Sequence, residues 1–166
     1  YFQDARRFVE KAREHFDVVI SDLTEPLEGG PSVYLFTREF FSRIADIMTE
    51  EGIFVLQAGS ADPFYHCFLA SCARTLKEVF PIVRPYWTFI FSFSLPWGYV
   101  LASKKFDPLG LTAREISERF RKRQLDRLGY LYPQFYASIF ILPRYLLAGL
   151  KKGELLTDEK PFIWKA

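Results

Sequence analysis

Apolar positions along the chain follow two spacings, and each spacing predicts a different element. Residues 16–22 and 53–57 are short apolar runs that end in polar side chains, a pattern typical of buried parallel strands. Residues 83–93 and 97–103 predict two further strands, joined as a hairpin at residues 94–96. Helical spacing predicts helices over about 5–15, 37–48, 63–80, 112–124 and 133–151. The order strand, helix, strand, helix, hairpin indicates the second half of an α/β sheet.

The connections carry signals of their own. Residues 23–36 are rich in Pro, Gly and Glu and predict a loop, after which the Thr37 side chain caps the next helix without a full capping box. Residues 51–52 predict a turn, and an extended tail is expected to end at Trp164.

Composition narrows the class of protein. The chain has 166 residues, of which 49% are apolar, so it has the size of one domain and enough apolar side chain for a core. The net charge of +2 argues against a nucleic-acid-binding protein, and the basic run at 114–127 is expected to be a solvated helix face. The longest apolar run, residues 135–143, is about half of the ~20 residues that span a bilayer, so no membrane association is expected. With two cysteines, the chain is not a disulfide scaffold, and we expect a cytoplasmic protein.

His66, Cys67 and Cys72 fall on one predicted helix. Their spacings of six and five residues do not bring them to a common face, and a zinc site needs about four converging ligands. We therefore expect these residues to belong to a helix core and expect no metal site.

In sheets of this type, chemistry lies beyond the carboxyl ends of the strands. That rule selects Asp4, the loop from Asp22 to Tyr34, and the segment from Gln57 onward. Asp22 and Glu25 place two carboxylates three residues apart, which suits the binding of a cationic amine and the removal of its proton. The alternative is an Asx turn followed by a solvated loop charge.

Aromatic side chains are available to line such an amine site. The candidates are Tyr34, Phe36, Phe91, Phe93, Trp97 and Tyr99. The glycine pair in residues 28–31 would allow a lid to close over a substrate, although an ordinary turn explains it as well. No nucleotide-binding glycine motif is visible.

Several motifs closely resemble the spermidine synthase family of polyamine aminopropyltransferases, in order and over nearly the whole chain. They are Asp-Leu-Thr-Glu-Pro (22–26), Leu-Phe-Thr-Arg-Glu-Phe-Phe (35–41), Gly-Ile-Phe-Val-Leu-Gln-Ala-Gly-Ser (52–60), residues 80–86, Pro-Trp-Gly-Tyr-Val-Leu-Ala-Ser (96–103), Leu-Pro (142–143) and Leu-Thr-Asp-Glu-Lys-Pro (156–161). The Glu-Gly-Gly-Pro loop (28–31) is similar to that of thermospermine synthases.

The resemblance implies an activity and a set of acceptor-side residues. The family transfers the aminopropyl group of decarboxylated S-adenosylmethionine to a polyamine amine and releases methylthioadenosine, with no cofactor. Asp22 matches the catalytic aspartate that orients and deprotonates the attacking amine. Glu25 stands where most members have an Asp that binds the acceptor, Gln57 matches a glutamine near the acceptor, and Trp97 resembles a tryptophan of the acceptor channel.

On the donor side, the resemblance implies contacts with adenine. Asp4 with Ala5 matches a pair whose carboxylate accepts from the adenine amino group, and Leu23 and Pro26 lie in a loop that borders the same ring. The implied fold is the C-terminal half of a Rossmann-like methyltransferase-type sheet, with parallel strands, helices and a closing antiparallel hairpin, followed by C-terminal helices.

Compared with the family, the chain is expected to be a partial catalytic domain over residues 1–166. Residues 1–105 would form the second half of the sheet and residues 106–166 a helical extension. The donor glycine-rich loop and the N-terminal β-domain are absent, so we expect part of a longer enzyme that is inactive alone. Glu25 in place of Asp, and Phe91 where members often have Pro, are expected to reshape the acceptor wall.

The acceptor stays open at this point. Putrescine, agmatine, an aminopropylagmatine and spermidine all fit, and the loop at 28–31 favours a longer acceptor. A homo-oligomer, dimer or tetramer, is expected from the family. The alternatives are an S-adenosylmethionine-dependent methyltransferase and a non-catalytic relative that acts as a binding module.

Overall fold

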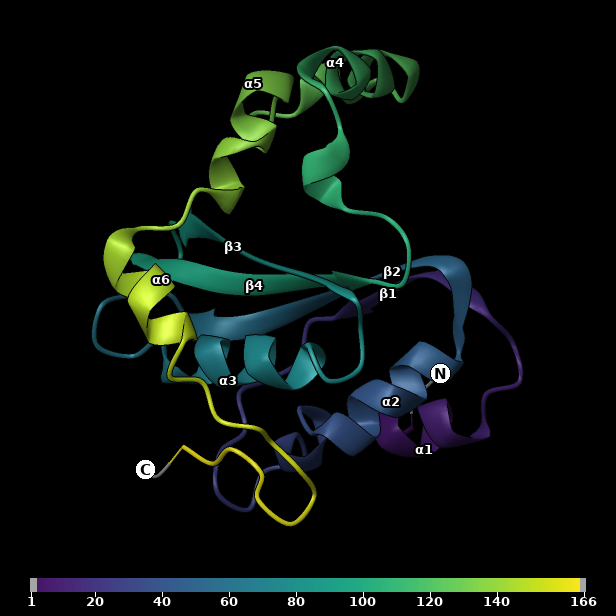
Figure 1. The fold of residues 1–166 in the computed structure, drawn as a ribbon, viewed down its shortest axis with the longest axis vertical. Coiled ribbons are helices and arrows are strands. Elements are labelled where there is room, and N and C mark those ends of the chain that lie inside the picture. Colours follow the sequence, from purple (N-terminus) through teal and green to yellow (C-terminus); the bar gives the residue numbers. More distant parts are fainter. Residues whose placement is uncertain (1–2, 165–166) are drawn as a thin grey trace.

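The computed structural model describes residues 3–164, which form a four-stranded mixed sheet with helices on both faces (Figure 1). The strands lie in the order β1-β2-β4-β3, with β1 at Phe16–Ser21, β2 at Met48–Ser60, β3 at Ile82–Ile90 and β4 at Leu95–Ser103. β1 runs parallel to β2, whereas β4 is antiparallel to both β2 and β3. The α/β prediction and its closing antiparallel hairpin are confirmed. Residues 1–2 and 165–166, which the expected domain boundaries include, lie outside the described residues.

The helices form two layers and a flank. α1, α2 and α3 lie on one face of the sheet, α4 and α5 lie over the other, and α6 packs beside α3 (Figure 1). Their bounds are α1 Ala5–Lys11, α2 Arg38–Asp46, α3 Cys67–Leu76, α4 Ala113–Lys122, α5 Pro133–Tyr136 and α6 Arg144–Leu150, with short 3-10 turns at Val33–Leu35, Pro108–Gly110, Leu125–Arg127 and Ser138–Phe140. None of the helices in the described range has the length and apolar character that crossing a bilayer requires.

The core lies between the sheet and the layer of α2 and α3. Phe54 of β2 is fully buried, and its ring centroid lies 5.9 Å from that of Phe41 on α2 and 6.3 Å from that of Phe80 after α3. Phe36 and Phe68 are also fully buried and meet edge to face at 4.9 Å. The apolar spacings that predict α2 and α3 therefore mark the faces that cover the sheet.

The prediction that the first strand is buried was wrong, although its parallel pairing is confirmed. Val18 and Ile20 are 58% and 71% exposed, because β1 is an edge of the sheet and pairs only with β2 within residues 3–164. An apolar run is compatible with a strand buried on both faces. It does not show whether the segments that cover the strand belong to the same chain.

The predicted turn at residues 51–52 lies inside β2. A Cβ at Gly52 would stand 3.0 Å from the Thr49 carbonyl oxygen and 3.1 Å from that of Phe16, so the missing side chain lets the two strands approach closely. The pairing of β1 with β2 is irregular here, since Phe16 faces Met48 and Val18 faces Ile53.

Three predicted helices are shorter than expected, for local reasons. The first ends at Lys11, because Ala12 is extended and residues 13–15 are all polar, with no apolar position to pack. The third begins only at Cys67, because Asp62 Oδ1 accepts from the amides of Phe64 and Tyr65 and forms a turn. The last is broken before Pro143, which has no amide proton to continue the helix and instead starts α6.

Candidate functional site

The carboxyl ends of β1 and β2 meet at one edge of the sheet, because the two strands are parallel. Ser21 pairs with Leu56, which places Asp22 beside Gln57. β4 pairs with β2 so that Tyr99 faces Gln57 and Trp97 faces Ser60. Strand pairing alone therefore gathers Asp22, Gln57 and Trp97, whereas the fourth predicted acceptor-side residue, Glu25, lies in the loop after β1.

The Gln57 amide is held by three segments of the chain. Its Nε2 donates to the carbonyl oxygen of Leu23 at 2.9 Å, and its Oε1 accepts at 2.8 Å from the amide of Gly59 and at 2.8 Å from the indole Nε1 of Trp97. Gln57 is buried, so these bonds satisfy polar groups that water does not reach. Gln57 thus links the loop after β1 to the aromatic wall on β4.

Asp22 is exposed, and its carboxylate makes no hydrogen bond or ion pair within residues 3–164. The pKa of the Tyr99 phenol is raised, chiefly by burial and in second place by the negative charge of the nearby Asp22 carboxylate. Tyr99 stacks on Tyr86 at 5.1 Å between ring centroids, and burial raises the pKa of Tyr86 to about 12. The Tyr99 phenol therefore lies near a free carboxylate, with the Tyr86 ring stacked behind it.

Glu25 turns toward the end of β2. A Cβ at Gly59, whose φ is +74°, would stand 2.8 Å from the Glu25 Oε1 atom, so the carboxylate lies against this glycine. Burial raises the pKa of Glu25, and no cationic side chain in the described range forms an ion pair with it. A partly desolvated carboxylate without a counter-ion suits a ligand that brings a positive charge.

The expected aromatic lining is only partly at this edge. Trp97 packs on Phe93 at 4.8 Å between ring centroids, and Tyr99 lies beside Asp22. Phe36 is in the core instead, and Phe91 is 75% exposed and contacts Phe89 in the hairpin turn. Helical and strand spacing cannot separate core rings from site rings, because both are apolar positions.

The predicted donor-side residues divide into two groups. Ala5 and Leu23 line one cavity of about 280 Å³ together with the exposed face of β1. Asp4 begins α1 beside Ala5 and accepts at 2.9 Å from the amide of Arg7 through Oδ1, which leaves Oδ2 for a ligand. Pro26 is buried, and its carbonyl accepts from the amide of Trp164 at 2.9 Å.

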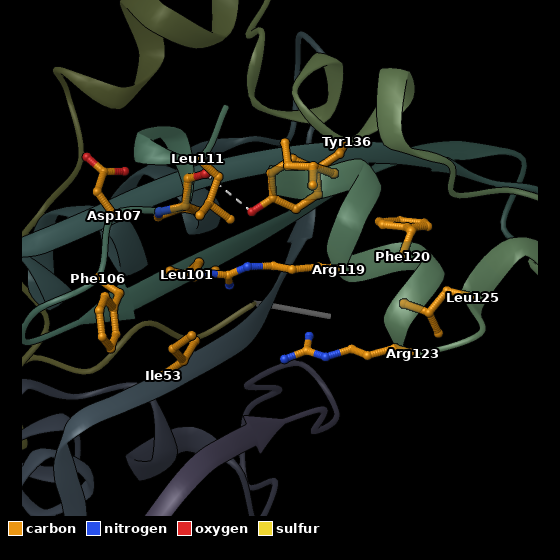
Figure 2. A pocket seen from close by; sticks show the side chains of 12 residues that line it. Ile53, Leu101, Phe106, Asp107, Leu111, Arg119, Phe120, Arg123, Leu125 and Tyr136 are labelled. Atoms are coloured by element: carbon orange, nitrogen blue, oxygen red, sulfur yellow. Dashed lines mark hydrogen bonds between the residues drawn. The ribbon is translucent and has the colours of Figure 1, made fainter. Parts of the chain in front are cut away.

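A second cavity, of about 300 Å³, lies between the other face of the sheet and α4 and contains none of the predicted site residues (Figure 2). Arg119 of α4 and Arg123, which directly follows this helix, extend along the cavity toward Ile53 and Leu101 of the sheet (Figure 2). The basic run is a solvated face as expected, since all of its arginine and lysine residues are exposed. Its apolar side, Ile116 and Phe120, is buried under the helix.

The three sulfur and imidazole residues of the third predicted helix separate in space. Cys72 is buried in the core, Cys67 is exposed, and His66 precedes the helix with Nδ1 at 2.9 Å from the Asp62 carbonyl oxygen. The expectation that all three belong to a helix core was therefore wrong for Cys67 and His66. Among residues 3–164, no group of three or more His, Cys, Asp or Glu side chains could hold a metal ion.

Sequence reasoning missed Tyr86 and the tail as neighbours of the site. Tyr86 lies on β3 and reaches Tyr99 across the hairpin, which an alternating strand pattern could have indicated. The tail returns to the loop after β1, where Leu27 and Trp164 form a parallel β-bridge. The motif at residues 156–161 was the signal in the sequence, but it does not say where the tail packs.

The model of the spermine/spermidine synthase domain matches residues 1–109. This chain belongs to the spermine/spermidine synthase family. It is 35% identical over 161 residues to polyamine aminopropyltransferase 2 of Hyperthermus butylicus, covering 95% of this chain and 52% of the relative. It is also 35% identical to thermospermine synthase ACAULIS5 of Arabidopsis thaliana, covering 95% of this chain and 47% of that protein.

Solved structures of the family show the same arrangement. A spermidine synthase in complex with the transition-state analogue AdoDATO is 28% identical and superimposes with a TM-score of 0.78, over 92% of this chain and 50% of that one. The spermidine synthase of Thermotoga maritima has a TM-score of 0.74 at 28% identity, over 92% of this chain and 48% of its own. The family resemblance and the Rossmann-like fold are thus confirmed, and the chain spans about half the length of the relatives it matches.

Proposed function

We propose that the protein transfers the aminopropyl group of decarboxylated S-adenosylmethionine to an amine of a polyamine. One observation carries this proposal. Two carboxylates, those of Asp22 and Glu25, lie at the common end of β1 and β2, and neither forms an ion pair within the described residues. Family membership supports the reaction type, because the relatives are named polyamine aminopropyltransferase and thermospermine synthase.

Asp22 would act on the attacking amine. An acceptor ammonium must lose a proton before its nitrogen can attack, and Asp22 is free to accept it. The nitrogen then forms a bond to the methylene next to the sulfonium, and the C–S bond breaks with its electron pair on sulfur. Methylthioadenosine leaves as a neutral thioether, and the new secondary amine carries the positive charge.

The remaining acceptor-side residues would position the substrate. Glu25 would pair with a distant ammonium of the acceptor, and the Trp97 and Tyr99 rings offer faces that attract cations. Gln57 would hold Trp97 and the loop at Leu23 in place through its three hydrogen bonds. Holding nitrogen and methylene in line supplies much of the rate enhancement in such a displacement.

For the donor, we propose that Asp4, Ala5, Leu23 and Pro26 border the adenine ring. Ala5 and Leu23 already share a cavity, which supports this placement. The sulfonium is itself electrophilic, so the proposed reaction uses no cofactor. The family further leads us to propose a homo-oligomer in the cytoplasm, which size-exclusion chromatography with light scattering and cell fractionation would test.

A product assay tests the function. The full-length protein is given decarboxylated S-adenosylmethionine with putrescine, agmatine or spermidine in separate reactions, and methylthioadenosine and the lengthened polyamine are quantified. Asp22→Asn is expected to lower turnover about 10²-fold to 10⁴-fold, since it removes a general base. Asp17→Asn is the matched control, because Asp17 is exposed near the start of β1, the strand that Asp22 follows, and accepts from Thr49 Oγ1 at 3.0 Å.

Each outcome of that assay is informative. Methylthioadenosine that depends on one acceptor and is lost only in Asp22→Asn supports the proposal and identifies the substrate. A response to spermidine alone would agree with the thermospermine-type loop at residues 28–31. A folded protein that turns over none of the acceptors would contradict the proposal, and methyl transfer from S-adenosylmethionine would then be assayed.

A further inference from the structure

The C-terminal tail and the loop that carries Glu25 are hydrogen-bonded to each other. The amide of Trp164 donates to the carbonyl of Pro26 at 2.9 Å, and the amide of Glu28 donates to the carbonyl of Trp164 at 3.4 Å. Leu27 and Trp164 thereby form a parallel bridge. In Figure 1 the yellow tail runs below α3 and reaches this loop, two residues beyond Glu25.

Aromatic packing fixes the same end of the tail to the core. The Phe162 ring lies 4.9 Å from that of Phe68 and 5.0 Å from that of Trp164, measured between centroids. Phe68 is fully buried, and a Cβ at Gly59 would stand 3.1 Å from its Cδ1 atom. The same Cβ would stand 2.8 Å from the Glu25 carboxylate. The Phe68 ring, on which the tail packs, and the carboxylate proposed to bind the acceptor therefore both contact Gly59.

The other end of the tail is fixed where the loop ends. Asp158 accepts from the Arg6 guanidinium and, at 2.7 Å, from Thr37 Oγ1, while its amide donates to Glu39 Oε2 at 3.0 Å. Arg6 also donates to the carbonyl of Tyr34 at 3.1 Å. The Arg6 contact holds the pKa of Asp158 below its usual range, so this carboxylate stays ionised near neutral pH.

We propose that residues 158–164, called the strap here, hold the loop at residues 23–36 in the conformation that binds the polyamine acceptor. The strap fastens the loop at Pro26–Glu28 through Trp164 and at Tyr34–Thr37 through Asp158 and Arg6. Trp164 acts as a positioning residue, because it touches the loop and not the reacting atoms. This proposal rests on the proposed function for its kinetic consequences, but the attachment of the loop is independent of it.

Trp164→Pro tests the strap, because proline has no amide proton to donate to Pro26. Ile163→Pro is the matched control, since the amide of Ile163 has no hydrogen-bond partner within residues 3–164 and its side chain is partly exposed. Loss of this hydrogen bond, together with the indole ring that packs on Phe162, is expected to raise the KM for the acceptor about 2-fold to 10-fold in Trp164→Pro. The kcat is expected to stay within about 2-fold of the control, since Asp22 itself is not altered.

Hydrogen exchange reads out the attachment without any substrate. Peptides that contain residues 26–30 are expected to exchange faster in Trp164→Pro than in Ile163→Pro, while peptides from α3 exchange alike. Should Trp164→Pro fail to fold, Phe162→Leu keeps an apolar side chain but removes the ring contacts with Phe68 and Trp164. It is expected to change loop exchange and the acceptor KM in the same direction.

The outcomes separate the two proposals. Unchanged loop exchange and unchanged acceptor KM in Trp164→Pro, or in Phe162→Leu if that variant must be used, would overturn the strap. A wild-type protein without turnover would contradict the proposed function alone, and loop exchange would still decide whether the strap holds the loop.

Discussion

β1 and β2 are both short apolar runs in the sequence, yet they occupy very different places. β2 is paired on both sides, and its Phe54, Leu56 and Ala58 side chains are fully buried. β1 is paired on one side, and Val18 and Ile20 are mostly exposed. The difference teaches that an apolar run reports the capacity of a strand to be covered, whereas the covering layer depends on the rest of the molecule.

The carboxyl ends of β1 and β2 differ in how far their polar side chains are hydrogen-bonded. Near its carboxyl end β2 carries Gln57, whose amide is engaged by three segments, whereas β1 is followed by Asp22, whose carboxylate has no partner within the described residues. The well-packed strand thus supplies a fixed frame, and the exposed strand supplies the free group. Of these two neighbouring strands, β2 therefore provides the packing, and the residue that follows β1 provides the proposed reactive group.

The largest expected effect contrasts the packing of the two strands. Phe54→Ala is expected to lower the free energy of unfolding by about 3–5 kcal/mol, because it opens a cavity among Phe41, Phe80 and the sheet. Ile20→Ala in the same 166-residue chain is expected to change it by less than about 0.5 kcal/mol, as at other exposed positions. Urea unfolding followed by circular dichroism measures both, and equal losses would show that β1 is covered in solution.

The next effect contrasts the two strand ends. Gln57→Leu is expected to lower the free energy of unfolding by about 1–3 kcal/mol, because it leaves the Trp97 indole N–H and the Leu23 carbonyl without their partner. Asp22→Asn is expected to leave that free energy within about 0.5 kcal/mol, since the carboxylate is exposed and unpaired.

Denaturant titration of both variants provides the measurement. A stable Gln57→Leu protein with unchanged Trp97 fluorescence would show that the glutamine does not hold the indole. A destabilised Asp22→Asn protein would show that this carboxylate has a structural role.

The smallest expected effect is the pH dependence that Glu25 confers. Because burial raises its pKa, the folded state holds the Glu25 proton more tightly than the unfolded state. Its contribution to stability is therefore present at acidic pH and is lost as pH rises from the ordinary glutamate range through the raised pKa. Glu25→Gln is expected to abolish this slope, which thermal unfolding across that pH interval would detect.

Acceptor binding should respond with the opposite sign. A bound ammonium favours ionised Glu25, so the affinity for the acceptor is expected to rise as pH rises through the same interval. Calorimetric titration of wild type and Glu25→Gln would measure it, with Glu28→Gln as the control for an exposed carboxylate of the same loop. A Glu25→Gln protein with the wild-type profile would remove Glu25 from the acceptor site.

Much of the site followed from the sequence because parallel pairing is a strong constraint. Once residues 16–22 and 53–57 are assigned as neighbouring parallel strands, Asp22 and Gln57 must lie at the same edge. The hairpin then brings Trp97 and Tyr99 to that edge. The details of Gln57 could not be predicted, since its partners include a carbonyl and an amide whose positions depend on loop geometry.

The sequence by itself determined the order of elements, the cap at Thr37 and the family, because these depend on local spacing and on motifs. Tertiary structure alone decided that Phe36 is a core residue, that β1 is an exposed edge, and that Trp164 returns to the loop at Leu27. These outcomes depend on contacts between residues far apart in the chain, and a local pattern of apolar and polar positions carries no information about which distant surface completes them.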